Sequence, residues 1–327
     1  MKIAVTGASG HIGSVLIQEL LDQGHELAIL LHKNHVHSSH QRLRIVNGSV
    51  LNPIAVHDLM SGCDAVIHAA AVISVSGKDQ ELIRSVNVEG TGVMFETAWQ
   101  LKVMKFVHVS SIHAFEQRPS DIPLDETRQL VGPHAPAYDQ SKRDGQLLAL
   151  QYAEKGMNVS IVNPTSVVGP PDYRPSLMGQ AIIGLANRTI PALIEGGFDF
   201  VDVRDVSRAI SAAMLHGQPG ASYLLSGKWY SIFEILETIN KCSGSRGSLP
   251  VVPEWVARMG VPFISLVSGL TGKAPLYTYE SIEALVAGNR HIDSSKAKRD
   301  LGFAPREFSE TIGDVYRWFD EHGYLKQ

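Results

Sequence analysis

The chain opens with a short apolar segment, a glycine-rich loop and an amphipathic helical pattern, and this order constrains the fold more than any other feature. Ile3–Val5 predicts a buried strand, glycines follow it at intervals of three residues, and residues 15–21 carry apolar side chains at helical spacing. Glycines in such a turn let the backbone approach a pyrophosphate closely, at the positive end of the helix that follows. We therefore expect a dinucleotide-binding loop here, although the spacing is GxxGxxG rather than GxGxxG, and a glycine-rich turn without a ligand is the alternative. The loop residues expected to contact the dinucleotide are Gly7, Ser9, Gly10, His11, Ile12 and Gly13.

Further short apolar segments alternate with helical patterns and predict βαβ units in a parallel sheet. Because each segment is almost continuously apolar, each is expected to be buried on both faces of the sheet. These segments are Leu27–Leu31, Leu43–Val46, Ala65–Ala69, Phe106–Val109 and Val159–Val162. The pattern predicts an α/β fold, a Rossmann-type doubly wound parallel sheet.

Prolines and glycines become frequent after Pro164, and the pattern changes to loops and short elements. We expect residues 1–164 to form a dinucleotide-binding domain and residues 165–327 to form mainly a smaller substrate-binding lobe. A strand near residues 223–225 is expected to return to the first sheet, so the two units are interleaved.

The composition excludes some classes of protein and fits others. The chain has 44% hydrophobic and 19% charged residues and a net charge of −4, so it has no basic excess that would indicate nucleic-acid binding. Two cysteines without CxxC spacing, Cys63 and Cys242, predict a reducing, cytoplasmic compartment. No signal-peptide pattern precedes the first strand.

The most apolar stretch, residues 260–270, is about half the roughly 20 residues that span a bilayer, so no membrane span is expected. We interpret it as a buried helix or a lid over a pocket, with shallow membrane contact as the less favoured alternative.

The residues after the second predicted strand bear on the cofactor. An acidic residue there would bind the ribose hydroxyls, but Leu31 is followed by His32, Lys33 and Asn34. Lys33, together with His32 or Arg42, is available to neutralise a 2′-phosphate. We therefore favour NADP(H), with NAD(H) as the alternative.

The same loop contains four histidines, His32, His35, His37 and His40. Imidazoles can ligate zinc, but no cysteine or carboxylate accompanies these four, and the segment has the character of an exposed loop. We predict a solvated loop and no metal site.

Tyr138 and Lys142 are four residues apart at the start of a second amphipathic pattern, so they are expected on one face of a helix. Ser111 follows the predicted strand Phe106–Val109, at the strand end where parallel sheets bind ligands. A phenol, an ammonium and a hydroxyl beside a nucleotide loop are suited to proton transfer. These three residues are the candidate catalytic set.

Several motifs in this order resemble the extended short-chain dehydrogenases/reductases, the family that includes the NAD-dependent epimerases/dehydratases. The resemblance covers almost the whole chain. It is carried by residues 6–13 (TGASGHIG), 68–71 (HAAA), 87–91 (NVEGT), 109–111 (VSS), 138–142 (YxxxK), 163–170 (NPTSVVGP) and 200–206 (FVDVRDV).

The resemblance implies roles for individual residues. Tyr138 would exchange a proton with the substrate carbonyl, Lys142 would lower the pKa of the phenol and hold the nicotinamide ribose, and Ser111 would bond the carbonyl oxygen. Asn87 would support the helix and water near the site. Further cofactor contacts are expected from Val50, Ala69, Ala70, Ala71, Tyr138, Lys142, Pro164 and Val167. The resemblance also implies a homodimer formed by helices around residues 87–101 and 138–154.

Departures from the family patterns indicate which branch of the family the chain resembles. The acidic residue that accompanies tightly bound NAD in sugar-nucleotide epimerases is missing, and Ile112 and His113 stand where dehydratases have carboxylates. Residues 163–170 and 200–206 resemble the dihydroflavonol reductase-like branch, which reduces aldehydes and ketones with NADPH.

We expect an NADP(H)-dependent oxidoreductase that reduces an aldehyde or ketone, or oxidises the alcohol, and that takes a small-molecule substrate rather than nucleic acid. A sugar-nucleotide epimerase with bound NAD is the alternative; a non-catalytic cofactor sensor is disfavoured by the intact serine, tyrosine and lysine. We interpret His113 as a polar wall residue rather than a pocket acid or substrate partner, and Asp205 as a structural helix N-cap rather than a catalytic group. Trp229 and Tyr230 are interpreted as lining the substrate lobe or packing.

Overall fold

The computed structural model describes residues 1–73, 79–244, 247–271 and 278–326. In this part of the chain, seven strands form one sheet in the order β10-β6-β5-β4-β1-β2-β3, and each neighbouring pair is parallel. The strands are β1 (Lys2–Thr6), β2 (Glu26–Leu31), β3 (Leu43–Asn47), β4 (Ala65–His68), β5 (Lys105–Val109), β6 (Val159–Pro164) and β10 (Ser222–Leu225).

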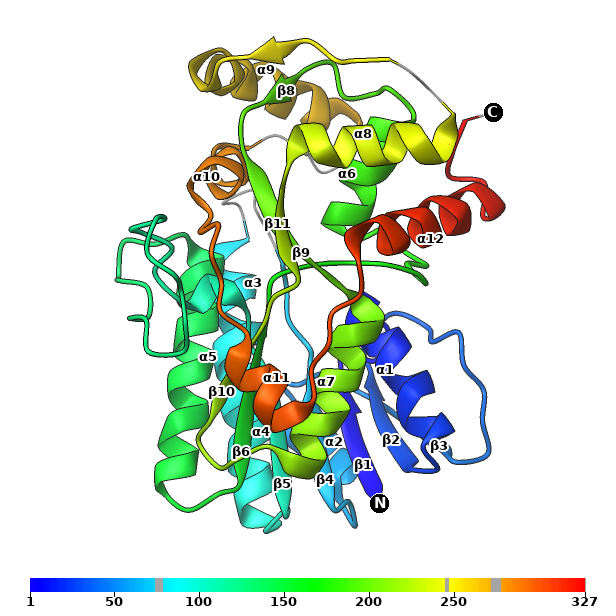
Figure 1. The fold of residues 1–327 in the computed structure, drawn as a ribbon. Coiled ribbons are helices and arrows are strands. Elements are labelled where there is room, and N and C mark those ends of the chain that lie inside the picture. The colour runs from blue at the N-terminus through cyan, green and yellow to red at the C-terminus, as the bar shows by residue number, and fades with distance from the viewer. Residues whose placement is uncertain (74–78, 245–246, 272–277, 327) are drawn as a thin grey trace.

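Helices cover both faces of this sheet, which confirms the predicted doubly wound α/β fold (Figure 1). Because side chains alternate along a strand, Ile3 and Val5 of β1 join one hydrophobic core and Ala4 joins the other. The first core is covered by α1 (His11–Asp22), α7 (Val203–His216) and α11 (Ser295–Leu301). The second is covered by α2 (Pro53–Met60), α4 (Gly90–Gln100) and α5 (Ala137–Glu154), with the short α3 (Gln80–Arg84) packed on α5.

The third predicted strand differs from expectation in its burial. Leu43–Val46 was expected to be buried on both faces, but only Val46 of β3 is buried, and Ile45 is 49% exposed. The reason is its place at the edge of the sheet, where it pairs with β2 alone. An edge strand is only partly covered by the helices that bury the central strands.

The chain after Pro164 contributes to both ends of the molecule. A three-stranded sheet, ordered β11-β9-β7, and a two-stranded pair of β8 and β12 lie beyond the carboxyl ends of the main strands, with α6, α8, α9, α10 and α12 around them (Figure 1). These elements are β7 (Ser166–Val168), α6 (Leu177–Ala186), β8 (Leu193–Ile194), β9 (Gly197–Asp202), β11 (Lys228–Ser231), α8 (Ile232–Ser243), β12 (Val251–Val252), α9 (Glu254–Thr271), α10 (Tyr279–Ala287) and α12 (Phe308–Glu321). In the sequence, these elements alternate with α7, β10 and α11, which pack with the main sheet; β10 pairs with β6. We refer to the distal group as the lobe.

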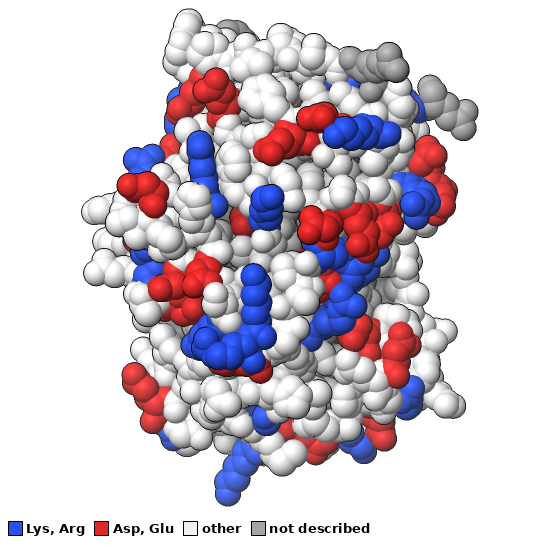
Figure 2. Space-filling model, viewed as in Figure 1, with Lys and Arg blue, Asp and Glu red and all other residues white. Residues whose placement is uncertain are grey.

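Residues 260–270 lie in α9, so the helical interpretation of this stretch is correct, while the side chains from residue 263 to 271 lie outside the described residues. Within the described ranges, none of the helices combines the length and the apolar character that a membrane span requires. Figure 2 shows that Lys and Arg side chains alternate with Asp and Glu over the face it displays.

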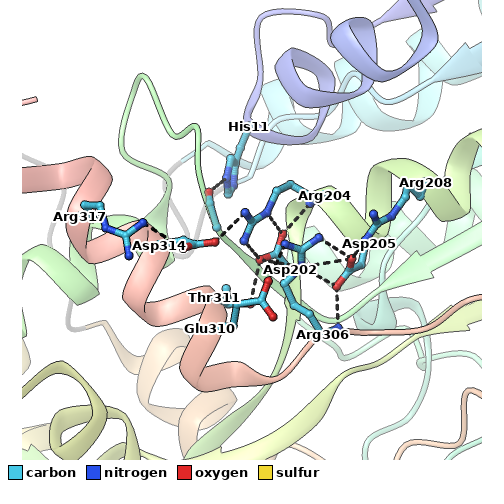
Figure 3. Close-up of polar contacts among 11 residues, drawn as sticks. His11, Asp202, Arg204, Asp205, Arg208, Arg306, Glu310, Thr311, Asp314 and Arg317 are labelled. Atoms are coloured by element: carbon cyan, nitrogen blue, oxygen red, sulfur yellow. Dashed lines mark hydrogen bonds and ion pairs between the residues drawn. The ribbon is translucent and has the colours of Figure 1, made fainter. Parts of the chain in front are cut away.

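A cluster of ion pairs joins α7 to α12 and the segment before it (Figure 3). The Asp202 carboxylate accepts hydrogen bonds from Arg204 at 2.7 Å and from the Thr311 hydroxyl at 2.8 Å, and Arg204 also binds Asp314 at 2.7 Å. Asp205 accepts from the backbone N–H of Arg306 at 2.8 Å and from its guanidinium at 3.0 Å. These contacts link the main sheet to the lobe.

Asp205 was expected to cap a helix, but Asp202 is the cap, since its side chain accepts from the backbone N–H of Arg204. The prediction was wrong because α7 begins at Val203, directly after β9, which places Asp205 inside the first turn. Burial alone would raise the pKa of Asp205, but hydrogen bonds from Arg306 and Arg208 outweigh it and lower the pKa. Its role in this structure is that of an ion-pair partner.

Candidate active site

The glycine loop between β1 and α1 is packed so closely that side chains do not fit. Gly7 has a φ of +76°, and a Cβ there would lie 2.5 Å from the carbonyl carbon of Ala69. A Cβ on Gly13 would lie 2.1 Å from the carbonyl oxygen of Gly7. Gly10 precedes α1 and provides no side-chain cap, so the first backbone N–H groups of the helix have no side-chain acceptor. This is a cradle into which an anion such as a pyrophosphate fits.

A cavity of about 1420 Å³ extends from this loop into the lobe. Its volume exceeds the roughly 300–1,000 Å³ of a typical ligand pocket, so it has room for a dinucleotide and a second molecule. Among the residues predicted for the site, those in the cavity wall are Gly7, Ser9, Gly10, His11, Ile12, Gly13, Ala69, Ala71, Ser111, Tyr138, Lys142, Pro164 and Val167.

Four predicted cofactor residues lie outside the cavity wall: His32, Lys33, Val50 and Ala70. His32 and Lys33 are exposed in the loop after β2, and Val50 is buried in the core against α4. Ala70 donates its backbone N–H to the Thr6 hydroxyl at 3.3 Å. Arg42, named as an alternative phosphate partner, donates to the carbonyl of Leu21 at 2.8 Å, near the end of α1 opposite the glycine loop.

The loop after β2 reaches the cavity through residues further along the chain: His35, Val36, His37 and Ser38. The His37 ring stacks on the Tyr173 ring with centroids 4.0 Å apart. The histidines were visible in the sequence, but the partner Tyr173 is more than a hundred residues away, so only the fold shows which of them face the cavity.

The segment containing residues 169–174 crosses the glycine loop. His11 Nε2 lies 2.7 Å from the carbonyl oxygen of Gly169, a contact drawn in Figure 3, and Arg174 donates to the carbonyl of Ser9. With the His37–Tyr173 stack, these contacts connect this segment to both nucleotide-side loops.

The three predicted catalytic residues converge at the carboxyl end of β5. Tyr138 and Lys142 lie one turn apart on α5, with the Lys142 Nζ 5.9 Å from the centroid of the Tyr138 ring. Lys142 donates to the carbonyl of Val109 at 3.2 Å, and the Ser111 hydroxyl accepts from the backbone N–H of His113 at 3.2 Å. All three side chains border the cavity that the glycine loop also borders.

Burial has opposite effects on the pKa values of the two titratable groups. It raises the pKa of Tyr138 above its ordinary value, while a hydrogen bond with Ser111 acts in the lowering direction. It lowers the pKa of Lys142 from 10.5 to about 8. The expectation that Lys142 lowers the pKa of Tyr138 is therefore not met in this structure, because desolvation is the larger effect and the ammonium is bonded to the Val109 carbonyl.

Asn87 supports the helix that carries the tyrosine. It lies in a π-helical segment, Ser85–Glu89, and its side chain accepts from the N–H of Val72 at 2.7 Å. The amide nitrogen donates to the carbonyl of Val72 and to the Ser141 hydroxyl, each at 3.0 Å. Asn87 thus connects the loop after β4 to α5.

Two histidines lie buried beneath the site, and sequence reasoning gave neither a role. His68 is held between the Thr6 and Thr91 hydroxyls at 2.7 and 2.9 Å, and burial lowers its pKa to about 3. Burial also lowers the pKa of His108, whose ring nitrogens have no hydrogen-bond partner among the described residues. Both are therefore neutral at physiological pH. His68 stands in the motif at residues 68–71 but was given no role there, and His108 lies in a segment that is otherwise apolar.

His113 lies in the cavity wall beside the candidate catalytic residues. Its Nδ1 is 3.1 Å from a carboxylate oxygen of Asp139, and its ring meets the Tyr138 ring edge-on at 5.8 Å between centroids. Asp139 was not singled out from the sequence; its position directly after Tyr138 was the available signal.

A doubly wound sheet with this glycine cradle and a Ser–Tyr–Lys set at its carboxyl edge defines the class of NAD(P)-dependent enzymes of the short-chain dehydrogenase/reductase type. The comparison with protein families agrees. Residues 3–226 match the model described as the NAD dependent epimerase/dehydratase family, and the chain belongs to this family.

Curated relatives are similar over nearly the whole chain. Sterol demethylase protein B of Methylococcus capsulatus is 30% identical, covering 99% of this chain and 100% of the relative. A putative dihydroflavonol 4-reductase of Synechocystis is also 30% identical, covering 98% and 95% respectively, which is consistent with the predicted reductase-like branch.

Among solved structures, UDP-glucuronic acid 4-epimerase from Bacillus cereus, in complex with UDP-glucuronic acid and NAD, matches with a TM-score of 0.79. It is 20% identical and covers 98% of this chain and 100% of the epimerase, so the match shows the shared fold.

Proposed function

We propose that the protein is an NADP(H)-dependent oxidoreductase that reduces an aldehyde or ketone, or oxidises the corresponding alcohol. The observation that carries the proposal is the convergence of Ser111, Tyr138 and Lys142 on a cavity that also reaches the glycine cradle. A nucleotide at the cradle and a carbonyl at the tyrosine would then share one space.

In this mechanism the nicotinamide supplies the hydride. The Ser111 hydroxyl donates a hydrogen bond to the carbonyl oxygen, and Tyr138 gives that oxygen a proton as negative charge develops on it. The high pKa of Tyr138 keeps the phenol protonated and ready to act as an acid. Lys142, with a pKa of about 8, is protonated at neutral pH and close enough to its pKa to return a proton to the phenolate.

The residues that would hold the dinucleotide fit it by their geometry. The N–H groups at the start of α1 would bind the pyrophosphate, and Lys142 would hold the nicotinamide ribose. Residues 32–42 contain no carboxylate, and His35 and His37 line the cavity with Lys33 nearby in sequence. A cationic or neutral loop favours a ribose 2′-phosphate over free hydroxyls, which supports NADP(H).

The test is a panel of aldehydes and ketones assayed in parallel with NADPH and NADH. We expect oxidation of the nicotinamide with at least one carbonyl compound and a kcat/KM about tenfold or more higher with NADPH. Absence of turnover with both cofactors across the panel, in protein shown to bind NADPH, would overturn the proposal. A preference for NADH would overturn the cofactor assignment alone.

The alternative is a sugar-nucleotide epimerase, since the NAD-containing epimerase from Bacillus cereus has the same fold. Such an enzyme retains NAD and catalyses no net oxidation. NAD released from the purified, denatured protein, together with interconversion of UDP-sugars, would establish it. A cytoplasmic location and a homodimer through α4 and α5 stay predictions; exposed Trp99 and Leu147 on these helices are consistent with the second.

A further inference from the structure

Arg174 differs from the other cationic side chains of the cavity wall. In the described part of the chain, these are Arg118, Lys142 and Arg174. Arg118 pairs with Glu283 at 3.0 Å, and Lys142 lies among the candidate catalytic residues. Arg174 has no carboxylate within ion-pair distance among the described residues, and it donates to the carbonyl of Ser9 in the glycine loop. A guanidinium has five N–H groups, so this bond leaves most of its donors available to an anion in the cavity.

Hydrogen bonds hold the backbone on both sides of Arg174. The buried carboxylate of Asp172 accepts from the backbone N–H of Ser176 at 2.8 Å and from its hydroxyl at 2.9 Å. The Tyr324 hydroxyl donates to the carbonyl of Tyr173 at 3.0 Å. The guanidinium is therefore carried by an anchored stretch of chain, which lowers the entropy lost when it binds a ligand.

The neighbour of Arg174 connects it to the loop after β2. The Tyr173 ring stacks on the ring of His37, which belongs to that loop and also borders the cavity. In dinucleotide-binding folds, this region lies beside the ribose 2′ position, where a carboxylate binds the free hydroxyl or an arginine accommodates a 2′-phosphate. Arg174 thus lies between the glycine cradle, through Ser9, and the region of the ribose 2′ position, through Tyr173 and His37.

Resting on the proposed NADP(H)-dependent function, we propose that Arg174 binds the ribose 2′-phosphate of the cofactor and sets the preference for NADP(H). It takes the role that the sequence suggested for His32 and Lys33, which lie outside the cavity wall. A phosphate monoester carries about −1.5 to −2 charges at neutral pH, and a planar guanidinium binds two of its oxygens at once. The stack of His37 on Tyr173 keeps the loop after β2 and Arg174 together around this phosphate.

The experiment measures binding of two nucleotides to the full chain by isothermal titration calorimetry. Adenosine 2′,5′-bisphosphate and adenosine 5′-monophosphate differ only in the 2′-phosphate. We expect the unaltered protein to bind the bisphosphate about tenfold or more tightly than the monophosphate. Arg174→Gln is expected to weaken binding of the bisphosphate by about tenfold to a hundredfold, and binding of the monophosphate by less than about twofold.

Two further variants separate the charge from the place of the side chain. Arg174→Lys keeps the charge but not the planar fork, and is expected to retain part of the preference for the bisphosphate. Arg118→Gln is the matched control, because it removes the other arginine of the cavity wall, and is expected to leave both affinities unchanged.

Salt provides a second measurement that a merely structural role of Arg174 would not affect. Ions screen the attraction between a guanidinium and a phosphate that are both accessible to solvent. In the unaltered protein, the preference for the bisphosphate is expected to fall as sodium chloride is added. In Arg174→Gln, the small remaining preference is expected to change much less.

Three results would overturn the inference. The unaltered protein binds the two nucleotides equally, or Arg174→Gln leaves both affinities unchanged, or it weakens both by the same factor. The last result would place Arg174 at the pyrophosphate or give it a structural role.

The failures of the two proposals are distinguishable. Reduction of a carbonyl with an NADPH preference that Arg174→Gln leaves intact would overturn this inference and leave the proposed function standing. Binding of the bisphosphate that depends on Arg174, without reduction of any carbonyl, would overturn the proposed function and leave this inference standing.

Discussion

The two ends of the cavity differ in what they bury. At the candidate catalytic end, polar and titratable side chains are buried near the carboxyl edge of the main sheet, including Tyr138, Lys142 and His68. Burial shifts the pKa of each in the direction that favours its neutral form. At the lobe end, the wall consists of apolar residues such as Leu193 and Leu285, which are also hydrophobic core. Removing a polar group from water destabilises the folded state, whereas burying an apolar side chain stabilises it. The lobe therefore gains stability from the apolar residues that line the cavity, whereas the buried polar groups around Tyr138 lower the stability of the fold.

The largest expected effect comes from removing the acid at the reaction centre. Tyr138→Phe is expected to lower kcat by about 10²–10⁴-fold, because general acid catalysis is lost, with NADPH affinity nearly unchanged. Steady-state kinetics with a verified substrate and a fluorescence titration with NADPH measure the two quantities. Tyr152→Phe on the same helix is the control, since its hydroxyl binds Glu96 away from the cavity. Full activity of Tyr138→Phe would refute the assigned chemistry.

The second prediction concerns the ion pairs that link the main sheet to the lobe, through Asp205 and Arg306. Asp205→Ala removes one of the carboxylates that hold the largely buried Arg306 guanidinium, which keeps Glu310 at 3.2 Å and Asp202 at 3.5 Å, and is expected to lower the free energy of unfolding by about 1–3 kcal/mol. Urea denaturation measures this. Asp58→Ala, at an exposed ion pair, is expected to cost about 0–1 kcal/mol. Equal losses in the two variants would show that the cluster does not hold the lobe to the main sheet.

The third prediction concerns the stability that the fold loses by burying the Lys142 ammonium. The pKa of Lys142 falls from 10.5 to about 8 on folding, so its ammonium destabilises the folded state by up to about 3 kcal/mol at neutral pH. Lys142→Met is expected to be inactive and more stable by up to that amount. Because the folded-state pKa is the lower one, the gain is full below pH 8 and disappears as pH rises towards 10.5.

Thermal and denaturant unfolding between pH 7 and 10.5 check this dependence. Lys155→Met, directly after the end of α5, removes an exposed ammonium that lies 4.3 Å from the centroid of the Tyr152 ring, and is expected to change stability by less than about 1 kcal/mol at any of these values. A less stable Lys142→Met at pH 7 would mean that the hydrogen bond to Val109 outweighs the cost of burial.

Much of the nucleotide end could be predicted because its signals are local. The apolar strands, the glycine intervals and the four-residue spacing of Tyr138 and Lys142 each depend on a few consecutive residues, and the carboxyl edge of a parallel sheet brings them together. The errors have equally specific causes. Strand β3 lies at an edge, and the cap of α7 is Asp202 because the helix starts directly after β9.

The contacts of the lobe could not be predicted from short stretches of sequence. The stack of His37 on Tyr173 and the pairing of Asp205 with Arg306 join residues more than a hundred positions apart.

By itself, the sequence determined the alternation of strands and helices, the glycine-rich loop and the choice of Ser111, Tyr138 and Lys142 as the candidate catalytic set, since backbone period and chemical type are set by neighbouring residues. Only the tertiary structure decided which loop histidines reach the cavity and which carboxylates are paired, such as Asp205 with Arg306. Burial and the neighbours of a group arise from packing between distant segments, and they set its pKa and its need for a partner.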